Sequence, residues 1–396
     1  MKKFKRVFVI VADSMGVGEL PDAAKYGDVG TNTLKHLSYS KDDFNIPTLQ
    51  KLGLGNVTDV NNTPSTDTPL ASFGKMKEVS VGKDTLTGHW EIMGLNVLKA
   101  FPSFTDNGFP KELIDLLIEK TGHGVLGNCA ASGTEILKDL GEQHVATGDL
   151  IVYTSADSVL QIAAHEEVVP LDELYEICHI AREITLDNPD WMVGRIIARP
   201  FIGTESSNFK RTPNRHDYAV KPCGKTTLVT LQENGYDTIS VGKIRDIFDG
   251  EGINEANPIK SNLDGMNKTI EIAKKDFNGL CFVNLVDFDA IYGHRRDAVG
   301  YAKCVEEFDS KVGELLELLT DDDLLIITAD HGNDPIHTGT DHTREHVPLI
   351  VYSSSLTGTN LGTRTSFADI SATIAENFNV SKAELGTSFL NELKEK

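Results

Sequence analysis

Acidic and histidine residues recur in three separate segments of the chain, in a combination that suits divalent metal ions. Carboxylate oxygens and neutral imidazole nitrogens together suit manganese or zinc, whereas calcium prefers oxygen ligands alone. Six such side chains exceed the four ligands of one tetrahedral ion, so we expect two ions that share them. Two ions about 4 Å apart can hold a phosphoryl group and stabilise both the attacking and the leaving oxygen. The six candidate ligands are Asp13, Asp289, His294, Asp330, His331 and His342.

Each of these residues also has an ordinary structural explanation. Asp13 could cap a helix after a strand, Asp330-His331 could form a polar turn, and His342 alone could be a surface histidine. We keep that ordinary interpretation for three further histidines, namely His216, His337 and His346. The recurrence of acids with histidines after separate apolar runs favours a metal site for the other six.

Short apolar runs rich in β-branched residues precede these polar segments and predict buried strands. They span residues 7–12, 281–286, 324–328 and 348–352, with a weaker run at 238–241. A helical pattern covers residues 297–319, with its apolar side chains on one face. Alternating strands and helices predict an α/β core with a mainly parallel sheet flanked by helices. Ligands of such sheets bind beyond the carboxyl ends of the strands, where the acids, the histidines and Lys243 are expected.

The middle of the chain differs from the rest and predicts an inserted α+β cap domain. Helical patterns cover residues 111–120 and 171–186, short strands are expected at 150–154 and 194–198, and a stretch with glycine and proline follows at 199–215. We therefore expect three parts: core at 1–99, cap at 100–217, and core again at 218–396.

A candidate nucleophile lies in the segment Gly82-Lys83-Asp84-Thr85-Leu86-Thr87-Gly88-His89-Trp90-Glu91. A threonine hydroxyl is a weak nucleophile at neutral pH, and coordination to a divalent ion lowers its pKa. Thr85 and Thr87 compete for this role. Asp84 and Thr85 could instead only cap a following helix, although a helix N-terminus also favours a bound anion.

The metal-ligand set resembles that of the alkaline phosphatase superfamily, and the phosphopentomutase family is the member that the whole chain resembles. The markers are Asp-Ser-x-Gly-x-Gly at 13–18, the Thr85 segment, Tyr-Thr-Ser-Ala-Asp-Ser at 153–158, Gly194-Arg195, Ala-Arg-Pro-Phe at 198–201, and Asp-His-Gly-Asn-Asp at 330–334. The resemblance implies an alkaline-phosphatase-like core. It also implies that Asp289, His294 and His342 hold one ion, and that Asp13, Asp330 and His331 hold the other. The Ser-x-x-Gly-His pattern of cofactor-independent phosphoglycerate mutases, which Thr85 to His89 resembles, favours Thr85 over Thr87.

The resemblance further implies the reaction, an interconversion of α-D-ribose 1-phosphate and D-ribose 5-phosphate or of their 2-deoxy equivalents. Thr85 would carry the phosphoryl group and a 1,5-bisphosphate would be the intermediate. Two Mn²⁺ ions would be the metals, and glucose 1,6-bisphosphate would prime the enzyme.

A basic stretch could hold the phosphate that is not reacting. Seven basic residues lie between positions 195 and 225, in a chain whose formal net charge is −21. Arginine binds phosphate through two parallel hydrogen bonds, so Arg195 and Arg211, with Lys243 from the core, are the candidate phosphate contacts. Ser155 and Asp157 are candidates for the ribose hydroxyls, although a solvated face and a strand-end turn would also explain these residues. A cap would also exclude water from the phosphothreonine.

Composition excludes several other classes of protein. The negative charge opposes binding to nucleic acid and to anionic membranes, and no apolar stretch approaches the roughly 20 residues of a membrane span. Five widely spaced cysteines without a CxxC motif indicate reduced thiols. We expect a cytoplasmic monomer that acts on small sugar phosphates.

Three other functions remain open from the sequence. A hydrolase of the same superfamily would use the same metals and Thr85 but release phosphate steadily. A phosphoglycerate mutase is disfavoured by the threonine at position 85 and by the Trp90-Glu91 continuation. A protein that only binds metal or sugar phosphate would tolerate the loss of Thr85.

Overall fold

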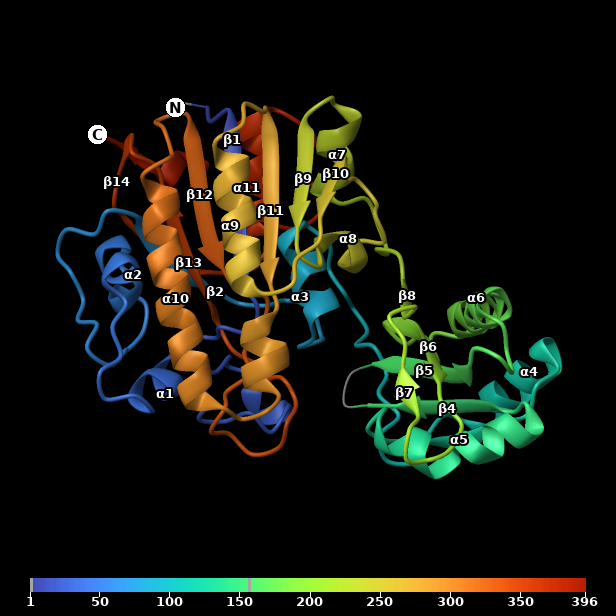
Figure 1. The fold of residues 1–396 in the computed structure, drawn as a ribbon. Coiled ribbons are helices and arrows are strands. Elements are labelled where there is room, and N and C mark those ends of the chain that lie inside the picture. Colours follow the sequence, from blue (N-terminus) through green and yellow to red (C-terminus); the bar gives the residue numbers. More distant parts are fainter. Residues whose placement is uncertain (1–2, 156–157) are drawn as a thin grey trace. The chain divides into compact units, whose positions relative to one another are not determined.

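The computed structural model describes residues 3–155 and 158–396. Contacts divide the chain into two compact units, one formed by Met1–Ala100 with Pro222–Lys396 and the other by Phe101–Lys221. The larger unit contains an eight-stranded sheet with the order β10-β9-β11-β1-β12-β13-β2-β15 (Figure 1). All neighbouring pairs are parallel except the two that β13 makes, so seven strands run one way and β13 runs against them. The mainly parallel α/β core predicted from the sequence is confirmed.

The central strands are the apolar runs that the sequence predicts. They are β1 (Arg6–Ala12), β11 (Gly279–Leu285) and β12 (Asp323–Thr328), and every residue in them is buried. Flanking them are β9 (Asp237–Val241) and β13 (Val347–Tyr352). Strands covered on both faces need apolar side chains at successive positions, which explains the continuous runs. The edges are completed by β10 (Glu255–Asn257), β2 (Ser72–Met76) and β15 (Asn360–Arg364).

Helices cover both faces of this sheet (Figure 1). On one face, α9 (Asn262–Ala273) packs beside α10 (Ala298–Leu316), and α1 (Thr33–Tyr39) and α2 (Pro47–Leu52) contact α10. The other face carries α3 (Thr85–Ile92), α7 (Thr227–Glu233), α8 (Ile244–Ile247) and α11 (Asp369–Phe378). A small two-stranded sheet pairs β14 (Leu356–Thr357) with β16 (Lys394–Glu395).

The smaller unit has a sheet of its own with the order β3-β4-β5-β6-β7, and β8 also pairs with β6. Its strands are β3 (Val125–Ala130), β4 (Leu150–Thr154), β5 (Val159–His165), β6 (Arg195–Ile202), β7 (Lys210–Arg211) and β8 (His216–Ala219). Its helices are α4 (Lys111–Thr121), α5 (Glu135–Thr147) and α6 (Leu171–Asp187). Two apolar clusters form its core, one of them built on α4 and α6 and the other on α5.

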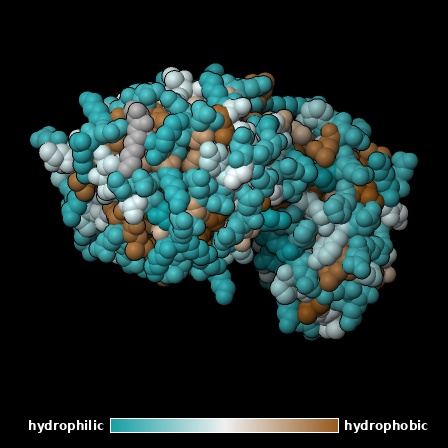
Figure 2. All heavy atoms as spheres, turned by 90° about the horizontal axis from the view of Figure 1, so that it is seen from above, coloured by the Kyte–Doolittle hydropathy of each residue, from teal (hydrophilic) through white to brown (hydrophobic). Residues whose placement is uncertain are grey.

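On the face drawn in Figure 2, hydrophilic side chains predominate and apolar ones are scattered among them. Among the described helices, none combines the length and the apolar character needed to cross a bilayer.

Candidate active site and metal centre

The carboxyl ends of three neighbouring strands bring the predicted metal ligands together. Asp13 follows β1, Asp289 lies shortly after β11, and Asp330-His331 comes just after β12. Because β1 lies between β11 and β12 in the sheet, these segments end side by side. All six candidate ligands belong to the larger unit, and the cluster they form is almost wholly buried.

One group of ligands consists of Asp289, His294 and His342, whose ligand atoms lie within 4.8 Å of one another. His294 Nε2 is 3.0 Å from Asp289 Oδ2, and His342 Nε2 is 3.5 Å from the same oxygen. Asn333 Nδ2 donates to Asp289 Oδ1 at 2.7 Å and leaves Oδ2 directed at the histidines. A short π-helical segment (Phe288–Gly293) carries Asp289 and leads into His294.

A second group consists of Asp13, Asp289 and His331, so Asp289 belongs to both groups. His331 Nε2 lies 3.5 Å from Asp13 Oδ1 and 3.4 Å from Asp330 Oδ2. The His331 and His342 rings, with centroids 4.1 Å apart, join the two groups. The structure thus brings all six predicted ligands into one cluster, and β12 ends at Thr328, before the adjacent Asp330 and His331.

Charge in the Asp13 group favours a bound cation. Burial, and then the neighbouring Asp330 and Asp289 carboxylates, raise the pKa of Asp13 well above its ordinary value. Among the described residues, Asp13 Oδ1 and Asp330 Oδ2 are buried and make no hydrogen bond. A divalent ion would relieve both the repulsion and the missing interactions, so the donor set fits the metals that the sequence predicts.

Neighbouring histidines lower the pKa of the other two carboxylates, Asp289 and Asp330. Burial disfavours ionisation of Asp289, but His342 and His294 outweigh it and hold its pKa well below the ordinary value. At Asp330, burial is likewise outweighed, chiefly by His331, so the pKa is lowered. Burial lowers the pKa of His331 itself, which favours the neutral imidazole that a metal ligand requires.

Thr85 is the first residue of α3 and lies at this cluster. Its Oγ1 is 3.2 Å from His331 Nε2, and its side chain is only partly buried. Asp84 caps the helix, because its side chain accepts a hydrogen bond from the Thr87 backbone N–H at 3.1 Å. The hydroxyl of Thr85 therefore combines access with closeness to a candidate metal ligand.

Thr87 has a different environment. It is fully buried, and its Oγ1 donates to Asp84 Oδ2 at 2.6 Å, so its hydroxyl supports the helix cap. The geometry favours Thr85 over Thr87 as the nucleophile, and it shows that capping by Asp84 and exposure of Thr85 coexist.

Two buried charged residues hold the loop that precedes Thr85. Arg344 donates to Glu78 Oε2 at 2.5 Å and to the Gly82 carbonyl at 2.6 Å. The Glu91 carboxylate accepts from the backbone N–H groups of Val79 and Ser80, at 3.0 and 2.7 Å. These contacts fix the backbone on the N-terminal side of the candidate nucleophile Thr85.

The predicted substrate contacts are distributed over both units. Lys243 follows β9 in the larger unit and is partly buried. In the smaller unit, Ser155 follows β4, and Arg195 begins β6 with its Nη1 3.7 Å from Asp217 Oδ2. Arg211 lies in β7 and is exposed. Asp157 lies outside the described residues.

Two of the three histidines set aside from the metal site bind backbone carbonyls. His346 Nδ1 donates to Glu19 O at 3.0 Å, and His337 Nε2 donates to Gly27 O at 3.1 Å. His216 is exposed in β8 and its ring packs at 4.6 Å from that of Tyr218.

Sequence reasoning missed several residues that support the ligands. His89 Nδ1 lies 3.1 Å from Asp330 Oδ2, and Asn284 Nδ2 donates to Asp13 Oδ2 at 2.7 Å. A polar Asn284 inside the apolar strand β11 is the signal that could have revealed it. Glu345 was missed for lack of any such signal.

Glu345 is a buried carboxylate that ties together the ligand-bearing loops. Its Oε1 accepts from the Thr33 and Thr343 hydroxyls, each at 2.7 Å, and its Oε2 accepts from the Thr33 and Gly18 N–H groups. It also packs so closely against Gly16 and Gly332 that a Cβ at either position would collide with it. The loops after β1 and β12 are therefore held to each other through this side chain.

A pH-dependent stability is expected from Glu345. Burial raises its pKa from 4.5 to about 7. Below pH 4.5 the folded and unfolded states both hold the proton; as pH rises toward 7 the unfolded state ionises first, so the folded state loses stability. Relative to Glu345→Gln, which cannot ionise, wild-type protein should lose up to about 3 kcal/mol over this range. Urea unfolding of both metal-free proteins from pH 4.5 to 8 measures this, and a pH-independent difference would contradict it.

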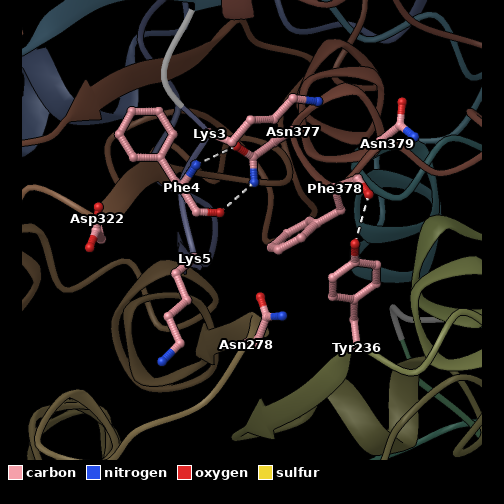
Figure 3. Close-up of a pocket in the computed structure, with 9 residues that line it drawn as sticks. All are labelled: Lys3, Phe4, Lys5, Tyr236, Asn278, Asp322, Asn377, Phe378 and Asn379. Atoms are coloured by element: carbon pink, nitrogen blue, oxygen red, sulfur yellow. Dashed lines mark hydrogen bonds between the residues drawn. The ribbon is translucent and has the colours of Figure 1, made fainter.

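A separate depression lies at the amino ends of the strands, where β1 begins, and not at the carboxyl ends that carry the candidate ligands (Figure 3). Its volume is about 440 Å³. In it, the Phe4 backbone and the Asn377 side chain exchange two hydrogen bonds, and Tyr236 donates to the Phe378 carbonyl. The first two contacts attach the segment before β1 to α11, and the third attaches the segment before β9 to α11, far along β1 from Asp13.

Comparison with known proteins shows the family of this chain. The family model described as the metalloenzyme superfamily matches residues 5–382. A phosphopentomutase from Clostridium tetani is 59% identical over 398 residues, and one from Clostridium beijerinckii is 59% identical over 396 residues. A third, from Clostridium botulinum, is 58% identical over 396 residues. Each comparison covers 99% of this chain and 100% of the relative. The chain therefore belongs to the metalloenzyme superfamily and, within it, to the phosphopentomutase family of isomerases.

Proposed function

We propose that this enzyme interconverts α-D-ribose 1-phosphate and D-ribose 5-phosphate, and the 2-deoxyribose equivalents, through a phosphothreonine at position 85. The observation that carries the proposal is the position of the Thr85 hydroxyl. It is accessible at the start of α3, 3.2 Å from His331, beside a buried cluster of carboxylates and imidazoles. A hydroxyl placed among divalent-ion ligands is suited to accept and donate a phosphoryl group.

Two divalent ions, which we propose to be manganese, would be held by the six clustered residues. Asp289, His294 and His342 would hold one ion, and Asp13, Asp330 and His331 the other. When bound, such ions lower the pKa of a hydroxyl and neutralise charge on a transferring phosphoryl group. The closeness of Asp289 to both ligand groups supports a pair of ions at short distance.

The reaction consists of two phosphoryl transfers of opposite direction. In the first, the C1 hydroxyl of ribose 5-phosphate attacks the phosphorus of phospho-Thr85. The bond from phosphorus to Thr85 Oγ1 breaks, and the hydroxyl proton passes to that oxygen. The resulting 1,5-bisphosphate turns around, and Thr85 Oγ1 attacks its C5 phosphate. The bond from phosphorus to the C5 oxygen breaks, so this phosphoryl group passes to Thr85, the Thr85 hydroxyl proton passes to the C5 oxygen, and ribose 1-phosphate leaves.

Phosphorylation of Thr85 is the direct test. We propose glucose 1,6-bisphosphate as the primer that supplies the first phosphoryl group. Mass spectrometry of the purified protein after incubation with it should locate one phosphate on Thr85, and none on Thr87. A phosphate on another residue, or none in a protein that isomerises pentose phosphates, would refute the proposal.

The competing hydrolase differs in its products. A mutase should convert ribose 1-phosphate to ribose 5-phosphate while releasing little free phosphate, because each phosphoryl group returns to Thr85. Measuring both products in one reaction separates the two functions. Phosphate release that equals or exceeds isomerisation would favour the hydrolase.

Arg211 offers a test of binding to the phosphate that does not react. We propose that Arg195, Arg211 and Lys243 contact it, and that Ser155 and Asp157 contact the ribose hydroxyls. Arg211→Ala should raise KM for ribose 5-phosphate by about 10- to 100-fold, since a charge-assisted hydrogen bond contributes about 1.5–3 kcal/mol.

Lys210 provides the matched control for Arg211. Both residues are exposed in β7, but they are adjacent in a strand and so face opposite sides. Lys210→Ala should leave KM within about threefold of wild type, as expected for a surface charge. Equal effects of the two substitutions would indicate a general effect of charge and not a contact at Arg211.

A further inference from the structure

We propose that His89 and Asn284 form a buried chain of polar contacts that positions both the nucleophile Thr85 and the ligand carboxylates Asp13 and Asp330. They would act as positioning residues, because neither would touch the substrate. The inference rests on the proposed function in that it takes Thr85 as the nucleophile and the two carboxylates as metal ligands.

His89 lies one helical turn after Thr85 in α3 and is fully buried. Its Nδ1 is 2.9 Å from the Thr85 carbonyl oxygen and 3.1 Å from Asp330 Oδ2. A carbonyl can only accept a hydrogen bond, so Nδ1 must carry the proton. One N–H group therefore faces the backbone of the nucleophile and a candidate metal ligand together.

The other ring nitrogen faces Asn284. Asn284 Nδ2 lies 3.3 Å from His89 Nε2 and donates to Asp13 Oδ2 at 2.7 Å. An amide NH₂ group has two hydrogens, so it can serve the carboxylate with one and His89 with the other. Nε2 then accepts, and the ring is the neutral Nδ1–H tautomer. Asn284 reaches Asp13 because β11 pairs with β1 in the register Val11 to Asn284.

Packing holds this chain in one arrangement. A Cβ at Gly88 would collide with the backbone carbonyl of Asp330, so α3 can approach the end of β12 this closely only with glycine there. The His89 ring packs against the ring of buried Phe282, with centroids 5.9 Å apart. The imidazole therefore has little freedom to turn, and its two nitrogens stay aligned with their partners.

The chain leaves the ligand oxygens directed at the metal centre. Because Asn284 binds Asp13 Oδ2, Asp13 Oδ1 is turned toward His331, 3.5 Å away. Asp330 is held similarly, since its Oδ1 accepts from the Ser14 N–H at 3.1 Å while Oδ2 lies beside His89. Partners of this kind usually change metal affinity or activity by about 10- to 100-fold when removed.

Variants of His89 separate positioning from mere packing. His89→Asn retains an N–H donor near the Nδ1 position, whereas His89→Gln and His89→Leu do not. We expect Gln and Leu to lower kcat by about 100-fold with KM for ribose 5-phosphate within threefold, and to weaken Mn²⁺ binding by about 10-fold or more. His89→Asn should recover kcat to within about 10-fold of wild type. Asn284→Leu should weaken Mn²⁺ binding in the same way.

His144 supplies the matched control in the smaller unit. It is buried, its Nδ1 donates to the Asp149 carbonyl at 2.6 Å, and its Nε2 accepts from the His165 N–H at 2.8 Å. It therefore has the same tautomer and the same two kinds of contact, in a unit that contains none of the six candidate ligands. His144→Gln should lower the melting temperature but leave Mn²⁺ affinity, measured by calorimetry on metal-free protein, within threefold of wild type.

Three outcomes would overturn the inference. The first is a folded His89→Gln protein with unchanged Mn²⁺ affinity and kcat within threefold of wild type. The second is a His89→Asn protein as impaired as His89→Leu, and the third is an equal loss of Mn²⁺ affinity in His144→Gln. Failure of the proposed function would look different, because the wild-type protein itself would then neither isomerise pentose phosphates nor carry phosphate on Thr85.

Discussion

Thr85→Ala is expected to reduce mutase turnover by about 10⁴-fold or more, because it removes the hydroxyl that we propose receives the phosphoryl group. The substitution removes one partly buried hydroxyl and leaves the cap made by Asp84 intact. Metal ions should still bind, since all six clustered ligands remain. Steady-state assay of ribose 5-phosphate formation, with calorimetric Mn²⁺ titration of the same preparation, measures both effects.

Two neighbouring substitutions act as controls for this result. Thr85→Ser keeps a hydroxyl at the same place and should retain turnover within about 100-fold of wild type. Thr87→Ala removes the hydrogen bond to Asp84 Oδ2, which costs about 1 kcal/mol of helix capping, but leaves the proposed nucleophile Thr85 in place. Its turnover should stay within about 10-fold. Retained turnover in Thr85→Ala would return the role to Thr87.

The core strands could be predicted from the sequence because burial leaves a simple pattern. The residues of β1, β11 and β12 are all buried, so each strand is an apolar run, and the predicted bounds lie within two residues of those found. The strand β5 was missed although it is equally buried. The polar residues Gln161 and His165 interrupt its apolar pattern. Their side chains form hydrogen bonds with Arg199 and Gly203, which no local sequence pattern reveals.

The smaller unit shows a second limit of local patterns. We predicted a strand that ends at residue 198 and placed the residues after it in a stretch with glycine and proline, without a strand. In the structure β6 continues to Ile202, and β7 and β8 both pair with it. Arg199 and Pro200 lie within β6, where a proline breaks the expected pattern. Pairing with β5 from Arg195 to Phe201 stabilises the strand despite these residues.

Candidate metal ligands could be recognised as a group, but their orientation could not. Asp287 and Asp289 both follow β11, yet only Asp289 joins the cluster, because the π-helical segment turns it inward. Asp287 Oδ2 instead accepts the Asn262 N–H at 2.7 Å. The contact between His89 and Asn284 joins residues 195 positions apart. Such pairs depend on the packing of α3 against the sheet, which sequence spacing does not specify.

Asp289→Asn is expected to have the largest effect on metal binding, because Asp289 is the one residue shared by both ligand groups. Removing its charge leaves His294 and His342 without the carboxylate that lies 3.0 and 3.5 Å from them. We expect Mn²⁺ affinity to fall by about 100-fold or more, and turnover to fall with it. Calorimetric titration of metal-free protein, with metal analysis of the dialysed protein, measures occupancy independently of activity.

Asp287→Asn is the matched control, since it makes the same chemical change two residues earlier and outside the cluster. It weakens one hydrogen bond to the start of α9, at a cost of about 1 kcal/mol, and should leave Mn²⁺ affinity within threefold of wild type.

Asp330→Asn and His331→Ala should resemble Asp289→Asn, because they too lie in the cluster. Exhaustive chelation should abolish turnover, and added Mn²⁺ should restore it in wild type and in Asp287→Asn. Full activity after chelation would contradict catalysis by metal ions. Equal losses of Mn²⁺ affinity in Asp289→Asn and Asp287→Asn would show that a general destabilisation, and not a lost ligand, explains the effect.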